Sequence, residues 1–268
     1  MTQTATSARS LDLFDLTGRS ALITGASGAL GSAAARALVG AGAHVTLAAA
    51  SVDKLDAVAA DVERVGGRAE RVVARPESTA DAEAMVKAAV QAAGRLDIVV
   101  CASGLNIVAP TADMADDDFQ KVMDANVRGS WLVSQAAGRQ MLAQGDGGKI
   151  VLVSSTRGKL GHPAGYSAYC ASKSAVEGLA RAMACEWGPQ GITVNAIGPT
   201  VFRSDLTAWM YEEEGPGKAV REAMLARIPI GRLGEPDDFA GVLVFLTSGA
   251  SDFMTGQVLY VDGGYTAG

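Results

Sequence analysis

The sequence predicts a doubly wound α/β fold with a parallel sheet of about seven strands. Short apolar runs alternate with longer stretches in which Ala and Leu recur at helical spacing. Most of the short runs are apolar at every position, which is typical of parallel strands covered by helices on both faces. The seven expected strands lie at residues 21–24, 44–48, 70–74, 97–102, 149–154, 192–197 and 257–261. Strands and helices that alternate with right-handed crossovers form a Rossmann-type sheet.

The stretches between these strands predict the helices that cover the sheet. They lie at residues 32–40, 52–65, 79–93, 117–143, 166–187 and 236–248. Glycines lie near their ends, where a left-handed residue commonly ends a helix: Gly40, Gly42, Gly94, Gly188 and Gly191. The regular alternation predicts a single domain over residues 13–268. Residues 1–12, which are mostly small and polar, are expected to be a flexible lead-in.

One segment breaks the alternation. Residues 204–236 lie between two expected strands and contain charged residues, a Gly-Pro-Gly and aromatic side chains. We expect this insertion to be a mobile lid over the substrate. Trp209 within it is a candidate substrate contact.

The composition favours a free-standing enzyme that acts on small molecules. Of the 268 residues 49% are hydrophobic, and the net charge of −6 leaves no basic excess of the kind that nucleic acid or an anionic membrane requires. No run of about eighteen apolar residues predicts a membrane span, and the N-terminal residues lack the apolar core of a signal peptide. Three cysteines without C-x-x-C spacing, together with the distant His44 and His162, predict a cytoplasmic protein without a metal site.

The turn after the first expected strand is rich in glycine. Residues 24–31 read TGASGALG and bring Gly25, Gly28 and Gly31 to the point where the chain enters the first helix. Glycines there permit a tight turn and the close approach of a pyrophosphate to the free N–H groups of the helix N-terminus. A strand-to-helix turn also favours glycine without any ligand, so this motif alone leaves nucleotide binding open.

The stretch YSAYCASK, residues 166–173, concentrates reactive side chains. Tyr169 lies four residues and Tyr166 seven residues before Lys173, so all three face one side of a helix. Proton transfer to or from a substrate oxygen needs a general acid/base. A phenol, with a pKa of about 10, serves better when a cation such as Lys173 favours the phenolate. On these residues alone, a half-buried amphipathic helix is the alternative.

Four motifs in order resemble those of the short-chain dehydrogenase/reductase family, over nearly the whole chain. They are the glycine motif at 24–31, N-x-x-G at 126–129, a serine at position 155 and Y-x-x-x-K at 169–173. The resemblance implies an NAD(P)-dependent oxidoreductase that transfers a hydride between a nicotinamide cofactor and a secondary alcohol or ketone.

The resemblance also implies a role for each residue that matches the catalytic motifs. Tyr169 exchanges the proton, Ser155 holds the substrate oxygen, Lys173 also holds the nicotinamide ribose, and Asn126 keeps a proton-relaying water near Lys173. Ser155 lies fourteen residues before Tyr169, one more than the commonest family interval, so Thr156 is the alternative for the serine role.

The same comparison, with the positions at the strand ends, predicts the cofactor-binding residues. They are Gly25, Ser27, Gly28, Leu30, Gly31, Ser51, Arg75, Ser103, Gly104, Tyr169, Lys173, Pro199, Thr200, Phe202 and Ser204. The chain departs from the family pattern at three places. Ala29 stands where the family has the middle glycine of the first motif, residues 101–104 read CASG in place of N-N-A-G, and Arg75 occupies the position of an adenine-contacting aspartate.

The end of the second strand leaves the choice between NAD and NADP open. An acid there would accept from the ribose 2′-OH and an arginine would accommodate a 2′-phosphate, but this chain has Ala48, Ala49 and Ala50 before Ser51. Ser51 is able to donate to a phosphate and Arg75 to reach it, which tips the prediction slightly toward NADP. The alternative for Arg75 is a solvated loop cation.

The segment RGKLGHPAGY, residues 157–166, lies between the expected serine and tyrosine and is expected to border the substrate. Arg157, His162 and Tyr166 are the candidate contacts, and the polar, glycine-rich composition favours a small sugar, polyol or sugar acid. Arg157 would bind a substrate carboxylate. The alternative is that it points outward and pairs with an acid on a neighbouring helix or subunit.

Two other functions compete with this prediction. A 3-oxoacyl thioester reductase would dock an acyl carrier on basic residues, and Arg128 and Arg139 are candidates for such a patch. A non-catalytic dinucleotide-binding protein would not need the complete set of catalytic motif residues that this chain retains. The resemblance further implies a homotetramer, with a small molecule, and neither nucleic acid nor a membrane, as its binding partner.

Overall fold

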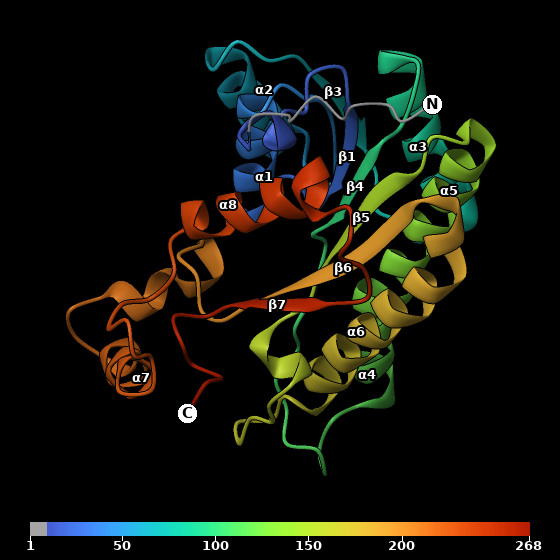
Figure 1. Cartoon of the computed structure of the whole chain (residues 1–268). Helices are drawn as coiled ribbons and strands as arrows, with labels where there is room; N and C mark the ends of the chain where they lie inside the picture. Colours follow the sequence, from blue (N-terminus) through green and yellow to red (C-terminus); the bar gives the residue numbers. More distant parts are fainter. Residues whose placement is uncertain (1–9) are drawn as a thin grey trace.

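The computed structural model describes residues 10–268 and has one parallel sheet with helices on both faces (Figure 1). The strands follow the order β3-β2-β1-β4-β5-β6-β7, and every neighbouring pair is parallel. They are β1 (Ser20–Thr24), β2 (His44–Ala49), β3 (Ala69–Val73), β4 (Ile98–Cys101), β5 (Gly148–Val153), β6 (Ile192–Pro199) and β7 (Val258–Val261). All seven predicted strands are confirmed, with bounds within two residues of those expected.

The helices also follow the prediction, with one long stretch divided. They are α1 (Ala29–Gly40), α2 (Val52–Arg64), α3 (Thr79–Ala93), α4 (Asp116–Met123), α5 (Gly129–Gln144), α6 (Ser167–Trp187), α7 (Pro216–Leu225) and α8 (Pro236–Thr247). The expected helix at 117–143 consists of α4 and α5 joined by a π-helical turn, η2 (Asp124–Arg128). Gly42, Gly94 and Gly191 have the expected positive φ, whereas Gly40 and Gly188 are helical and that prediction is wrong for them.

Two apolar layers pack on opposite faces of the sheet. Helices α1, α2 and α8 cover one face, and α3, α5 and α6 cover the other (Figure 1). Adjacent residues of β1 show the division, because Ile23 packs in the first layer and Leu22 in the second. A strand buried on both faces has no polar side, which explains the continuously apolar runs in the sequence.

The insertion at 204–236 has structure of its own beside the sheet. It contains a 3-10 segment, η5 (Asp205–Tyr211), and α7, which lies away from the sheet (Figure 1). Met210, Met224, Ile228 and Leu233 form a small separate core with Tyr265 near the C-terminus. Its movement as a lid stays a prediction. Most of the expected lead-in, residues 1–12, lies outside the described residues, and Asp12–Phe14 form a short 3-10 turn.

The carboxyl ends of the parallel strands meet at one edge of the sheet, where ligands of such folds bind. The strand order reverses between β1 and β4, which are neighbours in the sheet but are separated by β2 and β3 in the chain. Most of the predicted cofactor-binding residues follow these strand ends. Within residues 10–268, no helix is both long and apolar enough to span a bilayer.

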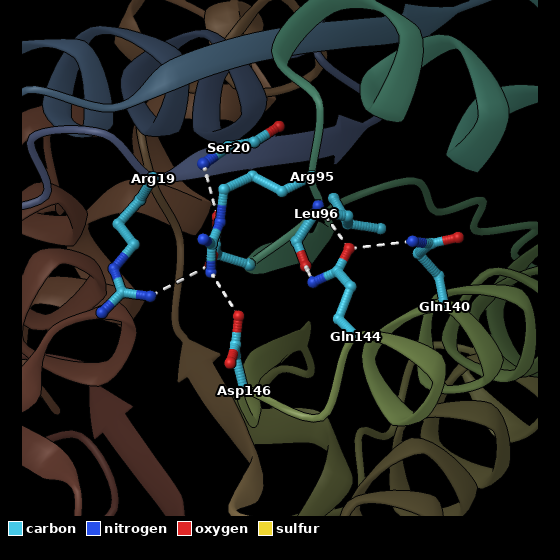
Figure 2. Close-up of polar contacts among 8 residues, drawn as sticks. Arg19, Ser20, Arg95, Leu96, Gln140, Gln144 and Asp146 are labelled. Atoms are coloured by element: carbon cyan, nitrogen blue, oxygen red, sulfur yellow. Dashed lines mark hydrogen bonds and ion pairs between the residues drawn. The ribbon is translucent and has the colours of Figure 1, made fainter.

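A buried carboxylate ties the opposite edge of the sheet together. Asp97 accepts hydrogen bonds from the Ser20 backbone N–H at 2.9 Å, from Arg19 at 3.0 Å and from Arg95 at 2.6 Å. The side-chain amide of Gln144 in α5 forms two hydrogen bonds with the Leu96 backbone. It accepts from the Leu96 N–H and donates to the Leu96 carbonyl, both at 2.9 Å. Figure 2 shows Arg19, Ser20 and Arg95 gathered at this point, with Gln144 beside Leu96.

The Asp97 carboxylate stabilises the fold in its charged form. Burial by itself would raise its pKa, but the hydrogen bonds from Arg95, Ser20 and Arg19 outweigh burial and hold the pKa below its usual range. A carboxyl with a lowered pKa in the folded state contributes stability above its unfolded pKa of about 4. That contribution is lost as the pH falls through the folded value.

We expect Asp97→Asn to lower the free energy of unfolding at pH 7 by roughly 1–3 kcal/mol, the range for a hydrogen bond to a charged group. Urea denaturation monitored by circular dichroism measures it. The difference from wild type should shrink below about pH 4. Asp146→Asn is the matched control, because Asp146 is an exposed partner of the same Arg95 at 3.5 Å and its loss should change stability by less than about 0.5 kcal/mol. Equal losses in the free energy of unfolding for the two substitutions would contradict the stabilising role of the buried Asp97 carboxylate.

Candidate active site

The glycine motif forms a tight turn between β1 and α1. Gly25 has a φ of 65°, and a Cβ there would lie 2.6 Å from the Ser103 backbone nitrogen, so only glycine fits against the loop after β4. A Cβ on Gly31 would collide with the Gly25 carbonyl oxygen. Gly28 is the N-cap of α1, and its N–H donates to the Gly25 carbonyl at 3.0 Å. With Ala29 in place of a glycine, the turn still closes as a cradle whose backbone suits a pyrophosphate.

The remaining residues of the motif differ in what their side chains offer. Ser27 is half-buried, and Gly28 beside it is exposed. The side chain of Leu30 packs against the apolar layer of α1 and α8. Leu30 therefore offers a ligand its backbone and not its side chain.

The strand ends that would face the adenosine carry few charges. Ala48 and Ala49 at the end of β2 are buried, and the Ser51 hydroxyl caps α2 by accepting from the Lys54 N–H at 3.4 Å. Arg75 is exposed. Lys54, in the first turn of α2, forms an ion pair with Asp205 of η5 at 3.0 Å. The sequence analysis missed Lys54, although its position three residues after Ser51 was a visible signal.

The loop after β4 lies directly over two catalytic motif residues. A Cβ on Gly104 would lie 3.3 Å from the Asn126 Oδ1 and 3.6 Å from the Lys173 Nζ. The Asn126 Oδ1 accepts from the Leu105 N–H at 2.7 Å, and its Nδ2 donates to the Leu105 carbonyl and to the Ser172 hydroxyl, both at 2.9 Å. The fully buried Asn126 thus joins this loop to α6.

The π-helical turn explains how Asn126 reaches that position. Residues 124–128 adopt the wider turn between α4 and α5, and such turns occur frequently at functional sites. The Asn126 carbonyl accepts from the Ser130 hydroxyl at 2.8 Å. The predicted water relay through Asn126 stays a prediction.

Lys173 is buried at the junction of α6 and β5. Its Nζ donates to the Val153 carbonyl at 2.8 Å and lies 5.6 Å from the centroid of the Tyr169 ring. Burial lowers the pKa of Lys173 to about 8, because the charged form loses hydration there. The pair expected from the four-residue spacing is therefore adjacent in space.

Tyr169 contacts the predicted serine. Burial raises the pKa of the phenol, while a hydrogen bond with Ser155 and the charge of Arg157 lower it. Arg157 is a cation whose charge opposes the effect of burial on this pKa, and the predicted effect of Lys173 stays a prediction. The Ser155 hydroxyl also accepts from the Arg157 N–H at 3.1 Å. The contact with Tyr169 favours Ser155 over Thr156, which lies in the 3-10 turn η3 (Thr156–Gly158).

Two of the predicted substrate contacts form a row with Tyr169. The rings of His162 and Tyr166 lie 4.2 Å apart, and those of Tyr166 and Tyr169 lie 6.2 Å apart edge to face. The Nδ1 of His162 accepts from the Ala164 N–H at 3.1 Å, and burial, Arg157 and Arg227 lower the His162 pKa. Among the ring contacts of the described residues, none joins Trp209 to this row. Its indole N–H donates to the Leu206 carbonyl within η5 at 3.1 Å.

The outward-pointing alternative for Arg157 is wrong, and its contact with a substrate carboxylate stays a prediction. Instead of pointing outward toward an acid, it is 9% exposed and donates to the Gly161 carbonyl at 2.8 Å and to the Tyr265 hydroxyl at 3.0 Å. Arg227 donates to the same hydroxyl at 2.8 Å. Arg227 and Tyr265 were missed by the sequence analysis, and the only local signal was that Tyr265 follows the D-G-G at 262–264.

The segment after β6 presents mostly backbone to the site. The Thr200 N–H donates to the Val261 carbonyl at 3.4 Å. The Phe202 ring is buried, and a Cβ on Gly234 would lie 2.7 Å from it. Ser204 caps η5, where its N–H bonds the Thr207 hydroxyl at 3.0 Å. Of these predicted residues, Pro199 is buried at the end of β6.

Cys170 is the nucleophile next to Tyr169 in the chain. Cys170 lies beside Tyr169 but its Sγ faces the Leu160 carbonyl at 3.6 Å, and burial raises its pKa, so it stays a thiol. Within residues 10–268, no group of His, Cys, Asp and Glu has the geometry to hold a metal ion.

Comparisons with known proteins match this chain over nearly its whole length. A family model described as enoyl-(acyl carrier protein) reductase matches residues 25–266. An uncharacterized oxidoreductase of Mycobacterium tuberculosis (strain ATCC 25618 / H37Rv) is 56% identical over 95% of this chain and 93% of that protein. A gluconate 5-dehydrogenase of Gluconobacter oxydans is 35% identical over 95% and 97%. A 3-oxoacyl-[acyl-carrier-protein] reductase of Rickettsia conorii is 34% identical over 94% and 98%.

Solved structures share the fold closely. A short-chain type dehydrogenase/reductase from Mycobacterium marinum has a TM-score of 0.89 and 37% identity, covering 97% of this chain and all of that one (100%). A gluconate 5-dehydrogenase from Burkholderia cenocepacia J2315 in complex with NADP and tartrate has a TM-score of 0.89 and 33% identity, with coverage of 97% and 100%. With its four motifs at one edge of such a sheet and relatives along its whole length, this chain belongs to the short-chain dehydrogenase/reductase family and is an NAD(P)-dependent oxidoreductase.

Proposed function

We propose that this enzyme interconverts a secondary alcohol and a ketone on a small polar substrate, a sugar, polyol or sugar acid. The observation that carries the proposal is the contact of Tyr169 with Ser155 above the buried Lys173. These residues lie at the strand edge that also holds the glycine turn. The nicotinamide cofactor, when bound, supplies or accepts the hydride.

Each of the chain's own residues then has a defined task. Tyr169 gives a proton to the substrate oxygen in reduction and removes it in oxidation. Ser155, whose hydroxyl lowers the pKa of the phenol against the effect of burial, orients the same oxygen. Lys173, fixed by the Val153 carbonyl, directs its remaining donors toward the ribose, and Asn126 holds the loop after β4 in place.

The surroundings of Tyr169 support a polar substrate. His162 and Tyr166 continue from it as an aromatic row with polar edges, which suits hydroxyl groups. Two relatives are gluconate 5-dehydrogenases.

The alternative is a 3-oxoacyl thioester reductase, the activity named for a relative from Rickettsia. The arginines proposed to dock an acyl carrier both form exposed contacts within the chain. Arg128 donates to the Glu77 carbonyl at 2.7 Å, and Arg139 pairs with Glu83 at 3.3 Å. Parallel assays on gluconate and on a 3-oxoacyl thioester distinguish the two substrate classes.

We propose NADP as the preferred cofactor. Residues 48–51 at the end of β2 include no acid that would repel a 2′-phosphate, and Ser51, Lys54 and Arg75 follow β2 and its neighbour β3. Lys54 is paired with Asp205 in the structure. A structural neighbour carries NADP. The cytoplasmic location and the homotetramer implied by the family stay predictions, and light scattering in solution checks the second.

Tyr169→Phe should abolish turnover and leave cofactor affinity within a few-fold of wild type, since only the proton-transfer hydroxyl is removed. Steady-state kinetics and a fluorescence titration with NADPH measure the two quantities. Tyr166→Phe, which keeps the neighbouring ring and removes a hydroxyl not assigned to proton transfer, is the matched control. Turnover of the Tyr169 variant near the wild-type rate would refute the assignment.

Lys173→Met should abolish activity and yet raise the stability of the protein without cofactor. The buried lysine has a folded pKa of about 8 against about 10.4 when unfolded, so the unfolded chain binds the proton more tightly. The wild-type free energy of unfolding therefore rises with pH between these values. The advantage of the Met variant should shrink by up to about 3 kcal/mol over that window.

Urea denaturation from pH 7 to pH 10.5 measures this advantage. Lys87→Met, at an exposed position of α3, is the control and should show no such pH dependence. A Met variant less stable than wild type at every pH would show that the buried Lys173 ammonium does not destabilise the fold.

Ala49→Asp should shift the cofactor preference toward NAD by at least ten-fold in the ratio of kcat/KM values. A carboxylate at the end of β2 accepts from the ribose 2′-OH and repels a 2′-phosphate. Ser51→Ala, which removes one phosphate donor without adding charge, should weaken NADP binding and leave NAD nearly unchanged. An unchanged ratio in Ala49→Asp would mean that Ala49 does not lie beside the ribose.

A further inference from the structure

Two arginines and one tyrosine form a cluster at the C-terminal end of the chain. The Tyr265 hydroxyl accepts from Arg157 at 3.0 Å and from Arg227 at 2.8 Å. The Arg227 guanidinium also lies over the Tyr265 ring at 4.3 Å, and that of Arg157 lies 5.5 Å from the same ring. Tyr265 is 2% exposed, so it forms a fixed base for both cations.

The positive charge of this cluster is not neutralised within the described chain. Neither Arg157 nor Arg227 is among the ion pairs of residues 10–268, although Arg203, Arg221 and Arg232 in the same region all pair with acids. Arg157 is buried, and a buried guanidinium ordinarily has a carboxylate partner. Two unpaired cations that share one neutral hydroxyl form a site suited to an anion.

The local sequence builds the cluster through the D-G-G motif. The Asp262 carboxylate accepts from the N–H groups of Gly264 and Thr266, both at 2.9 Å, which closes a turn at the end of β7. Gly263 and Gly264 have φ angles of 62° and 91°, and a Cβ on Gly264 would lie 2.8 Å from Pro229. This close packing against the segment that follows α7 brings Tyr265 beside Arg227.

The cluster adjoins the proposed catalytic row. Arg157 lies two residues after Ser155, and its guanidinium bonds the carbonyl of Gly161, the residue before His162. Burial and the charges of Arg157 and Arg227 lower the pKa of His162. The charge of Arg157 also opposes the rise that burial causes in the pKa of Tyr169. An anion on Arg227 would therefore lie on the substrate side of Tyr169, away from the adenosine end at β2.

We propose that Arg227, fixed by Tyr265 and reinforced by the charge of Arg157, binds the carboxylate of a polyhydroxy acid substrate. This inference rests on the proposed function and narrows its substrate class to sugar acids. A guanidinium matches a carboxylate with two parallel hydrogen bonds. Arg227 is exposed and so is able to meet a ligand, whereas the buried Arg157 supplies charge and rigidity.

The test measures binding without turnover. Isothermal titration of the full-length protein saturated with NADPH compares gluconate with sorbitol, its neutral analogue of the same chain length, and with sorbitol 6-phosphate. Because all three probes are alcohols and the cofactor is reduced, no reaction takes place. A failure of the proposed reaction is therefore distinguishable from a failure of this site.

Wild type should bind gluconate at least ten-fold more tightly than sorbitol, in line with a hydrogen bond to a charged group. Arg227→Gln should abolish that difference and leave the affinity for sorbitol unchanged. Tyr265→Phe keeps the ring but removes the shared acceptor, so it should reduce the preference in part. Arg232→Gln is the matched control, because Arg232 is an exposed arginine of the same region that pairs with Asp238, and it should retain the full preference.

Three outcomes would overturn the proposal. They are equal wild-type affinity for gluconate and sorbitol, tighter binding of sorbitol 6-phosphate than of gluconate, and an Arg227→Gln variant that loses thermal stability while keeping the gluconate preference. If gluconate binds with the expected preference but no alcohol is oxidised with NADP, the anion site stands and the proposed reaction fails.

Discussion

The hydrogen bond from the Lys173 Nζ to the Val153 carbonyl is the constraint on which the rest of the site depends. It fixes α6 against the end of β5, so that Tyr169, one turn earlier on α6, meets Ser155, two residues beyond Val153. Gly104 lies over the same nitrogen, where a Cβ would make a tight contact of 3.3 Å with the Asn126 Oδ1. A misplaced ammonium would move every one of these groups.

This arrangement works against stability. A buried ammonium is poorly hydrated, and this loss of hydration lowers the pKa of Lys173 to about 8. The phenol of Tyr169 is shifted in the opposite direction for the same reason, since burial disfavours its anion. Burial thus moves the pKa values of the two groups apart, because each group loses hydration in its charged form. The fold tolerates the strain because its apolar layers and the Asp97 anchor lie elsewhere.

Charge is distributed unevenly between the two ends of the site. Near the adenosine end, Lys54 is held by Asp205, so its charge is already partly satisfied. Near Tyr169, Arg157 and Arg227 converge on a neutral hydroxyl, and burial together with their charges lowers the pKa of His162. The second location therefore keeps a stronger attraction for an anion.

The sequence by itself determined the fold, because a strand buried on both faces must be apolar throughout. Most of the seven expected runs are of this kind, and all seven became strands. It also determined the pairing of Tyr169 with Lys173, because one helical turn separates them. It could not show that Asn126 lies in a π-helical turn or that Arg157 is buried, since both depend on contacts with loops distant in the chain. Arg227 and Tyr265 are 38 residues apart and meet only through the packing of the D-G-G turn against Pro229. Tertiary structure decided that contact, because no local periodicity or spacing encodes the docking of two separate loops.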